Sequence, residues 1–375
     1  MWIEKSNMVD KNDDIIDKIA VKSNFNIENI LRKAVDIKAS DVHISVSAPP
    51  IVRVNGKLLP IMNEPVKPKD SYALIKQMLS EKQFSCLQEV GEIDLSYSLD
   101  SVGRFRVNVF KQKYGYCMAL RIINPVVPSM QSLGLPGFVE KLCLARRGLI
   151  LVTGPAGSGK STTLASMVDY MNKTRNAHIV TIEDPIEYLH KQGTCLINQR
   201  EVGTDTASFA SALRASLRQD PDIILLGEMR DKETITVAIM AAETGHLVLT
   251  TMHTVGAVKT IDRIVDGFSF HQQQQVRLQL SGIIEAVISQ QLLPTADENR
   301  RVVALETMLA TPAIRNLIRE GKTHQIQMAL QTGQKYGMVT MDKSIINLYQ
   351  TGEITRDTAV KYAVDREYIL RELGA

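Results

Sequence analysis

The sequence has no apolar run that approaches the roughly 18 residues of a membrane span, and its N-terminus lacks an apolar signal segment. Its 4 cysteines form no CxxC pair, which argues against a zinc module and against a disulfide framework. Aromatic residues make up only 5% of the chain, and the net charge is +3. That charge is too small to indicate a nucleic-acid or membrane surface by itself. We therefore expect a cytosolic protein whose cysteines are small buried residues.

The length of the chain, 375 residues, is large for a single hydrophobic core and predicts two domains. Polar, apolar and proline-containing stretches divide it into a polar tail at 1–26, a small α/β domain at 27–124, a stiff linker at 125–135 and a second α/β domain at 136–375. In the second domain, strand-like and helical runs alternate as in a parallel sheet flanked by helices. After Thr254 we expect mainly helices, interrupted by one strand at Arg301–Leu309.

The first domain is expected to carry arginines on one face of its sheet. Apolar residues alternate with polar ones through 93–99 and 105–109, which predicts two strands. Because side chains alternate between the faces of a strand, burial of the apolar set places Arg106 on the opposite face. A third strand at 116–123 carries Arg121. The alternative to a functional role is that both arginines lie on a solvated face.

One motif dominates the second domain. The stretch Gly154-Pro-Ala-Gly-Ser-Gly-Lys-Ser161 fits the phosphate-binding pattern GxxxxGK[ST], the Walker A motif. An apolar, β-branched run at 148–153 precedes it and a helical pattern at 162–171 follows it. This is the order of strand, loop and helix that the motif requires. The residues predicted to bind nucleotide are Gly154, Pro155, Ala156, Gly157, Ser158, Gly159, Lys160, Ser161 and Thr162.

Each part of this motif has a physical role in binding ATP. Glycines let successive backbone N–H groups point at phosphate oxygens, and the start of the helix adds a partial positive charge. Lys160 would reach the β and γ phosphates, and the Ser161 hydroxyl would hold Mg²⁺. The alternative, a glycine turn that only caps a helix, is disfavoured because the full pattern and both flanks agree.

Hydrolysis needs a metal partner and a group that orients water in addition to the phosphate loop. The run Asp222-Ile-Ile-Leu-Leu-Gly-Glu228 is an apolar strand that ends in a carboxylate. This is the placement of a Walker-B acid, which contacts Mg²⁺ directly or through a water. A second acidic group, Glu183, Asp184 and Glu187, follows the preceding strand, and ligands collect at such strand ends. Spacing does not choose which acid polarises the attacking water, and a structural or surface acid is the alternative at each position.

Arg214 and Arg218 are four residues apart on a predicted helix at Thr206–Arg218, so they share a face. Arginines of one subunit commonly neutralise charge on a γ-phosphate that another subunit holds. The alternative is an ion pair with a neighbouring acid such as Asp220 or Asp222, and spacing favours neither interpretation.

His246 and His253 bracket one predicted strand, and their odd separation places them on opposite faces, which argues against a metal pair. A lone histidine at a strand end is more often a hydrogen-bonded structural residue. This strand, however, belongs next to the nucleotide, so both histidines are candidate site residues.

With these residues in place, the chain resembles type IV pilus retraction ATPases, the PilT family of the secretion and pilus motor superfamily. The matching segments are Ala39–Ile44, Arg104–Asn108, the Walker A motif, TIEDPIEY, ALRASLRQDPDIILLGEMRD and TGHLVLTTMHT. The resemblance covers nearly everything after residue 26. It implies an α/β protein with a PAS-like N-terminal domain and a RecA-like P-loop motor domain that has a helical C-terminal part, assembled as a homohexamer.

The resemblance also implies roles that spacing leaves open. Glu187 matches the family's catalytic glutamate, and Glu228 matches the Walker-B glutamate beside Mg²⁺, together with Ser161. The remaining matches are His246 and His253 to the family's histidine box, Arg106 and Arg121 to the N-terminal arginines that reach the phosphates, and Arg214 and Arg218 to the motor-domain pair.

The same resemblance also bears on whether the protein retracts pili or extends them. Ala313–Ile318 looks like the AIRNLI segment associated with retraction, and extension or secretion relatives usually carry a four-cysteine zinc module that is missing here. On physics alone this segment is an amphipathic helix after Pro312. The departures from the family pattern are Ala156 where Thr is frequent, Met252 in the histidine box, and a longer N-terminal tail.

The sequence therefore predicts a cytoplasmic, Mg²⁺-dependent hexameric ATPase that drives pilus retraction and twitching motility at the inner face of the cytoplasmic membrane. The implied partners are a PilC-like platform protein of the inner membrane and other pilus motor ATPases, with no nucleic acid. The alternatives are a pilus-extension or type II secretion ATPase, an accessory PilU-like motor, a RecA-like nucleic-acid motor, and a nucleotide-gated binding protein without turnover.

Overall fold

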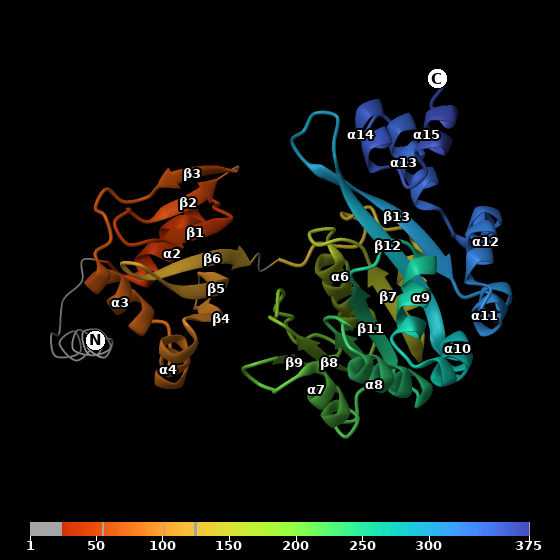
Figure 1. Cartoon of the computed structure of the whole chain (residues 1–375), viewed down its shortest axis with the longest axis horizontal. Coiled ribbons are helices and arrows are strands. Elements are labelled where there is room, and N and C mark those ends of the chain that lie inside the picture. The colour runs from red at the N-terminus through yellow and green to blue at the C-terminus, as the bar shows by residue number, and fades with distance from the viewer. Residues whose placement is uncertain (1–24, 55, 101, 124–125, 375) are drawn as a thin grey trace, which may run out of the picture. The chain divides into compact units, whose positions relative to one another are not determined.

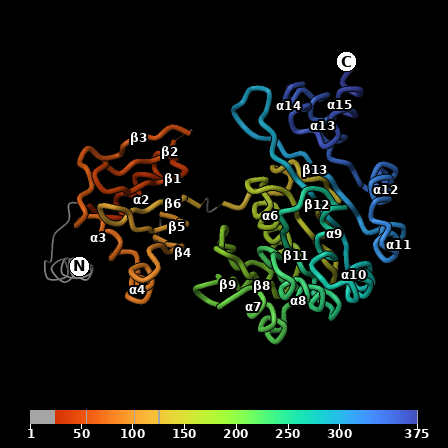
Figure 2. The backbone as a smooth tube through the Cα atoms, viewed as in Figure 1, coloured from red at the N-terminus to blue at the C-terminus, as the bar shows by residue number. Residues whose placement is uncertain are grey.

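The structure, a computed structural model, describes residues 25–54, 56–100, 102–123 and 126–374. Residues 1–24 of the predicted tail therefore lie outside the described residues. Contacts divide the chain into two compact units, with the boundary after residue 125. We call the part before this boundary unit 1 and the part after it unit 2. Unit 1 is drawn in red to orange and unit 2 in yellow to blue (Figures 1 and 2).

Unit 1 is an antiparallel sheet with helices, as Figure 1 shows. The strand order in its six-stranded sheet is β3-β2-β1-β6-β5-β4. The strands are β1 Asp41–Ile44, β2 Ile51–Val54, β3 Lys57–Pro60, β4 Glu92–Leu99, β5 Gly103–Gln112 and β6 Gly115–Ile123, and the helices are α2 Ile27–Asp36, α3 Pro68–Lys76 and α4 Glu81–Val90. The three strands predicted from 93 to 123 are confirmed. They form the consecutive pairs β4–β5 and β5–β6.

Unit 2 is built on a seven-stranded sheet in the order β13-β12-β7-β11-β10-β8-β9. Its strands are β7 Gly148–Thr153, β8 His178–Glu183, β9 Leu196–Glu201, β10 Ile223–Leu226, β11 Leu247–Met252, β12 Ile284–Pro294 and β13 Arg301–Leu309. The pairs from β12 to β9 are parallel, and β13 pairs antiparallel with β12. The predicted α/β fold class is confirmed.

The central strands of unit 2 are buried on both faces. Every residue of β7, β10 and β11 is buried, which explains why these strands appear in the sequence as continuous apolar runs. Leu149 and Leu151 pack into the core on one face of the sheet, and Ile150 and Val152 pack into the core on the other. This division follows the alternation of side chains along a strand, and it sets the strands that carry the site in a rigid frame.

Helices cover both faces of this sheet and form the C-terminal part. They are α5 Phe138–Cys143, α6 Lys160–Thr174, α7 Phe209–Ser216, α8 Lys232–Glu243, α9 Ala257–Asp266, α10 Phe270–Ile283, α11 Pro312–Arg319, α12 Ile326–Thr332, α13 Met341–Gln350, α14 Arg356–Tyr362 and α15 Arg366–Glu372, with short 3₁₀ turns at Thr323–Gln325 and Gln334–Tyr336. In α11, Ile314 and Ile318 are fully buried in the core. In the part of the chain that the structure describes, no helix combines the length and apolar character needed to span a membrane.

The sequence misses two strands of this sheet. The stretch after Thr254 was expected to be helical apart from one strand, but Ile284–Pro294 forms β12, so that expectation is wrong there. Its polar residues interrupt any period of two. Strand formation is decided by pairing on both sides, in parallel with β7 and antiparallel with β13. The other missed strand is β9, which pairs with β8 at the edge of the sheet.

The segment predicted as a linker contributes to the core of unit 2. Met130 and Leu135 are buried and pack in the same cluster as Val139 and Ile150. A turn at residues 129–134 places Met130 and Leu135 side by side against this cluster. The backbone N–H of Leu135 donates to the carbonyl of Met130 at 3.0 Å. Only the start of the 125–135 segment therefore remains as a candidate linker.

Candidate nucleotide site

The predicted glycine loop lies between β7 and α6, in the strand, loop and helix order that its motif requires. Gly154 follows β7 with a φ of 141°, and a Cβ atom there would lie 2.2 Å from the carbonyl oxygen of Gln290. Gly159 has a φ of 87° and serves as the N-cap of α6. Side chains are excluded at Gly154 by contact and disfavoured at Gly159 by conformation. The loop can therefore form only with glycine at these positions, and it leads directly into the start of a 15-residue helix.

Lys160 is the first residue of α6 and lies back over the loop. Its Nζ atom donates to the carbonyl of Gly154 at 3.0 Å and to the carbonyl of Pro155 at 2.9 Å. Burial lowers the pKa of Lys160, and the charges of Glu228 and Glu187 act in the opposite direction. The charges of two acids that follow different strands therefore influence the pKa of the lysine in the loop.

Glu228 follows β10 and is held close to the next strand. The backbone N–H of Gly227 donates to Ile182 at 2.8 Å, and the N–H of Met229 donates to Thr251 at 3.1 Å. These bonds anchor the residues on both sides of Glu228, which is 9% exposed. One of its carboxylate oxygens lies 2.7 Å from Nε of Arg230.

The acidic loop after β8 contains carboxylates in different surroundings. Glu183 accepts hydrogen bonds from Thr181 at 2.8 Å and from Gln199 at 3.4 Å, and burial raises its pKa to about 7. Asp184 is exposed. Glu187 is half-buried, and its side chain makes no hydrogen bond or ion pair with any residue that the structure describes. The geometry thus distinguishes the three acids, whereas their spacing did not.

A tyrosine that the sequence analysis did not single out connects this acidic loop to the glycine loop. The hydroxyl of Tyr188 lies 3.0 Å from the hydroxyl of Thr162 in the first turn of α6. The carbonyl of Tyr188 accepts from Nε2 of Gln199 on β9 at 2.8 Å. Because β9 itself was missed, the sequence carried no signal for the second contact.

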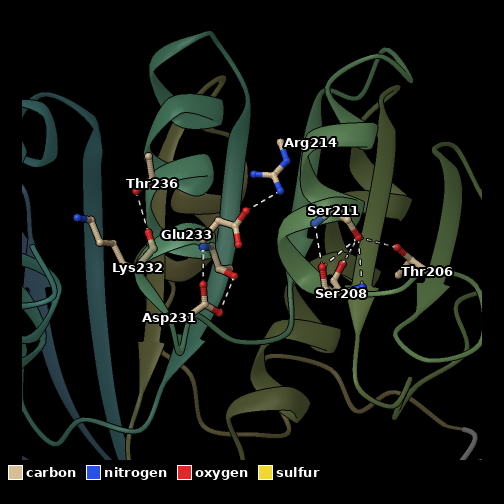
Figure 3. Close-up of polar contacts among 9 residues, drawn as sticks. Thr206, Ser208, Ser211, Arg214, Asp231, Lys232, Glu233 and Thr236 are labelled. Atoms are coloured by element: carbon tan, nitrogen blue, oxygen red, sulfur yellow. Dashed lines mark hydrogen bonds and ion pairs between the residues drawn. The ribbon is translucent and has the colours of Figure 1, made fainter.

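Of the predicted arginine pair, Arg214 lies on α7 and Arg218 lies in the turn that follows it. The helix begins at Phe209, where Ser208 caps it, and ends at Ser216, not at Thr206 and Arg218 as expected. Figure 3 shows α7 beside α8, with Arg214 directed at Glu233. An Arg214 guanidinium nitrogen donates to the Glu233 carboxylate at 2.6 Å. Arg218 donates to the carbonyl of Arg214 at 3.4 Å. An ion pair is therefore present, but its acid is Glu233 of the next helix and not one of the two aspartates considered from spacing.

The two predicted histidines lie at opposite ends of β11. His253 follows the strand, and its Nε2 atom lies 3.5 Å from the Glu228 carboxylate. His246 precedes the strand, where its ring contacts the carbonyl of Ala241 at 2.9 Å and its own carbonyl accepts from Gly148 at the start of β7. Within unit 2, His253 thus lies at the carboxyl ends of the parallel strands, where the glycine loop also lies, and His246 lies at their amino ends.

In unit 1, the predicted arginines lie in one row across the sheet. Arg106 on β5 is the cross-strand partner of Arg121 on β6, and Arg121 is the partner of Asp41 on β1. Arg53 on β2 continues the row as the other partner of Asp41. Partners that face each other across strands project from the same face, so this row brings three arginines and one aspartate together on one face of the sheet.

The donor set of unit 2 fits a nucleoside triphosphate with Mg²⁺. A glycine loop at a helix start binds phosphate through backbone N–H groups, and Lys160 supplies the positive charge. Mg²⁺ prefers oxygen ligands and is commonly held by one or two carboxylates together with substrate phosphates. Ser161 and Glu228 are the residues that would hold the metal, and Glu187 is a carboxylate available to accept a hydrogen bond from water.

Comparison with known proteins gives consistent matches along the chain. The family model described as type II/IV secretion system protein matches residues 18–373. The type IV pilus retraction ATPase PilT of Pseudomonas aeruginosa is 49% identical over 321 residues, which cover 86% of this chain and 93% of the relative. The type IV pilus ATPase PilU of the same organism is 40% identical over 336 residues, covering 90% and 88%. A crystal structure of the pilus retraction motor PilT with bound ADP matches with a TM-score of 0.88 at 47% identity, covering 93% of this chain and 100% of that one.

Proposed function

The chain belongs to the type II/IV secretion system protein family, among the type IV pilus retraction ATPases, and from this premise we propose that it is a hexameric, Mg²⁺-dependent motor that drives pilus retraction. The proposal rests on one observation in unit 2. Glu187 follows β8 and Glu228 follows β10, so both acids come after the carboxyl ends of strands that run parallel to β7, as the glycine loop does, and their charges oppose the lowering of the Lys160 pKa by burial. Transfer of a phosphoryl group to water requires a phosphate-binding lysine, an acid near the metal and an acid that orients the water. Residues of these kinds lie here at the carboxyl ends of the parallel strands.

The loop and its helix bind the triphosphate in this proposal. Backbone N–H groups from Gly157 to Ser161 donate to phosphate oxygens, and Lys160 exchanges the carbonyls of Gly154 and Pro155 for the β and γ phosphates. This exchange is favourable because a charged pair of hydrogen bonds replaces bonds to neutral carbonyls. Lys160 thereby stabilises charge that develops on the transferred phosphoryl group.

The two acids have separate tasks. Glu228 and Ser161 hold Mg²⁺, which supplies charge neutralisation at the phosphates when bound. Glu187 orients the attacking water and accepts its proton. Glu187 suits this task better than Glu183. The Glu183 carboxylate already accepts hydrogen bonds from Thr181 and Gln199, whereas the Glu187 carboxylate accepts none from any residue that the structure describes.

The arginines and histidines are assigned to the same reaction by the proposal. Arg106 and Arg121 of the PAS-like unit and Arg214 and Arg218 of the RecA-like unit approach the phosphates when subunits of a hexameric ring close. His253 contacts Glu228 and helps to position it, and His246 belongs to the same histidine box. The start of the 125–135 segment is the proposed hinge between the two domains.

The platform at the cytoplasmic face of the inner membrane and other pilus motors are the proposed partners. A ring that binds a PilC-like membrane protein would convert closure of its sites into movement of that protein. The relatives named PilT and PilU are both pilus ATPases, which supports a pilus role. The higher identity to PilT, 49% against 40%, favours the principal retraction motor over an accessory motor.

Matched variants test the chemistry. Glu187→Gln should bind a fluorescent ATP analogue with the affinity of the wild type but release phosphate at least 100-fold more slowly, because it retains the binding loop and loses the base. Lys160→Ala should weaken binding itself. Phosphate release by Glu187→Gln at the wild-type rate would contradict the role of this carboxylate.

The direction of movement is tested in cells that carry this chain. Cells with Lys160→Ala in place of the wild type should accumulate surface pili and stop twitching, since assembly continues without disassembly. Cells without pili would indicate an extension motor. Normal twitching with a second motor present, and its loss when that motor is removed, would indicate an accessory role.

A further inference from the structure

We propose that Gln290, on β12, is a positioning residue for the glycine loop. Its side-chain amide forms hydrogen bonds with the loop and with the first turn of α6, and these bonds hold the loop in the conformation that binds phosphate. The inference deepens the proposed function and rests on it, because it concerns the same nucleotide site. Gln290 is not placed in contact with phosphate and acts through the backbone of the loop.

The Gln290 amide makes a hydrogen bond on each side. Its Nε2 atom donates to the carbonyl of Ser158 at 2.6 Å, and its Oε1 atom accepts from the hydroxyl of Thr163 at 3.1 Å. Ser158 lies in the loop and Thr163 in the first turn of α6, so one side chain fixes both. Gln290 is 1% exposed, and buried hydrogen bonds of this kind are costly to leave unmade.

The backbone around Gln290 is packed just as closely against the loop. A Cβ atom on Gly154 would lie 2.2 Å from the Gln290 carbonyl, and one on Gly159 would lie 3.2 Å from Nε2 of Gln290. Ser289 is the parallel partner of Thr153, the last residue of β7. Gln290 therefore stands one residue past the end of β7, at the point where the loop leaves the sheet.

Only an amide satisfies both contacts. The carbonyl of Ser158 needs a donor, and the hydroxyl of Thr163 donates to an acceptor. A glutamate at this position would keep the acceptor and lose the donor, and a methionine of similar size would lose both. Without these hydrogen bonds, the Ser158 carbonyl is left unpaired in the interior, and the N–H groups next to it lose their fixed directions.

The expected consequence is a loss of nucleotide affinity with little loss of chemistry. The N–H groups of the loop bind phosphate equally in the ground state and in the transition state, so weakening them raises KM more than it lowers kcat. Lys160, Glu187 and Glu228 remain in place. A residue that only stabilised the fold would lower the melting temperature and leave the KM of the folded protein unchanged.

The experiment compares Gln290→Met with Gln291→Met in the full-length protein. Gln291 is the next residue of β12 and projects from the opposite face, so it is a matched control. For Gln290→Met we expect the KM for ATP and the dissociation constant of a fluorescent ADP to rise at least tenfold, with kcat within about threefold of wild type. Gln291→Met should behave as wild type.

A folded Gln290→Met protein with the wild-type dissociation constant for fluorescent ADP would overturn the inference. If Gln290→Met does not fold, Thr163→Val removes the hydroxyl partner while Gln290 stays intact. Its dissociation constant should then rise several-fold, and an unchanged value would also overturn the inference. The ADP measurement separates this test from that of the proposed function. Wild-type protein that binds ADP but hydrolyses no ATP contradicts the proposed motor and leaves the role of Gln290 measurable.

Discussion

The Nε atom of Arg121 donates a hydrogen bond of 3.0 Å to the carboxylate of Asp41, across the adjacent strands β6 and β1. Arg53 approaches the other oxygen of Asp41 at 3.7 Å. Burial alone would raise the pKa of Asp41, but hydrogen bonds from Ser40 and Arg121 lower it below its ordinary value. A single carboxylate therefore offsets the repulsion within a row of three arginines that also includes Arg106.

Asp41→Asn should destabilise unit 1 because like charges that face each other across strands repel. The expected loss is about 1 kcal/mol at low ionic strength, and it should shrink in 1 M salt, where the Debye length is about 3 Å. The measurement is thermal unfolding of wild type and variant at both salt concentrations.

Asp94→Asn is the matched control for this prediction. Asp94 lies on β4 of the same sheet and is exposed, and it accepts a hydrogen bond from Asn108 at 3.3 Å. Its cross-strand partner is Asn108 and not an arginine, so it provides the same change of charge on the same face but outside the arginine row. A loss of stability in Asp41→Asn that does not depend on salt, or an equal loss in Asp94→Asn, would count against electrostatic compensation in the row.

We expect Glu183 to make the stability of unit 2 depend on pH. Burial raises its pKa from 4.5 to about 7, so the folded state binds the proton more tightly than the unfolded state. Stability from this group is therefore largest below pH 4.5 and is lost as pH rises toward 7. Glu183→Gln cannot ionise and keeps an acceptor oxygen for Thr181. It should be more stable than wild type by roughly 1–2 kcal/mol at pH 8 and nearly equal to it at pH 5.

Thermal unfolding at pH 5 and pH 8 measures this difference. An exposed acid elsewhere in unit 2 supplies a control, because Asp266→Asn removes a similar charge from a position that is open to solvent. It should leave the pH dependence of wild type intact. If Glu183→Gln gave the same melting temperature as wild type at pH 8, the raised pKa would not be linked to folding.

The sequence identified the parts of this site that are local in the chain. The glycine loop, its strand and its helix lie within about thirty residues, so pattern alone places Lys160 and Ser161. The acids after β8 and β10 follow because parallel strands carry their ends to one edge. In contrast, Gln290 and Ser158 are 132 positions apart. Their contact depends on β12 lying beside β7, and the mixed polar and apolar sequence of β12 does not specify a strand.

The direction of a strand in its sheet is a second feature that the sequence did not predict. His246 and His253 were grouped because they bracket one strand, but the ends of a parallel strand lie at different edges of the sheet. His253 is beside Glu228, and His246 is beside the start of β7. Spacing along a strand predicts which face of the sheet a side chain lies on. It does not predict whether the residue lies at the amino or the carboxyl end of the parallel strands, and the direction of β11 decides this for the two histidines.

The ion pair between Arg214 and Glu233 allows a structural role to be separated from a catalytic one. The side chains are 49% and 61% exposed, so loss of the pair should cost less than about 1 kcal/mol. Arg214→Gln and Glu233→Gln break the same pair and should have similar stability. If Arg214 acts on phosphate in a neighbouring site, Arg214→Gln should lower the ATPase rate at least tenfold, and Glu233→Gln should not. Equal rates in the two variants would assign Arg214 to structure alone.

Arg230 and Mg²⁺ should compete for Glu228. In the structure, Nε of Arg230 lies 2.7 Å from a carboxylate oxygen of Glu228, and that oxygen also lies 3.5 Å from His253. Metal binding to this carboxylate, directly or through a water, is opposed by a cation already beside it. Removal of the cation should therefore favour the metal, and removal of the carboxylate should disfavour it.

Titration of ATPase activity with Mg²⁺ at saturating ATP tests this competition. Arg230→Gln should lower the Mg²⁺ concentration at half-maximal rate by about three- to tenfold, the effect of roughly 1 kcal/mol from an ion pair with one exposed partner. Glu228→Gln should raise it and lower the maximal rate. Lys232→Gln removes a nearby positive charge whose partner is Gln272, and it should leave the midpoint unchanged. Shifts of Arg230→Gln and Glu228→Gln in the same direction would contradict a metal role for Glu228, because only competition for one carboxylate makes the two changes opposite in sign.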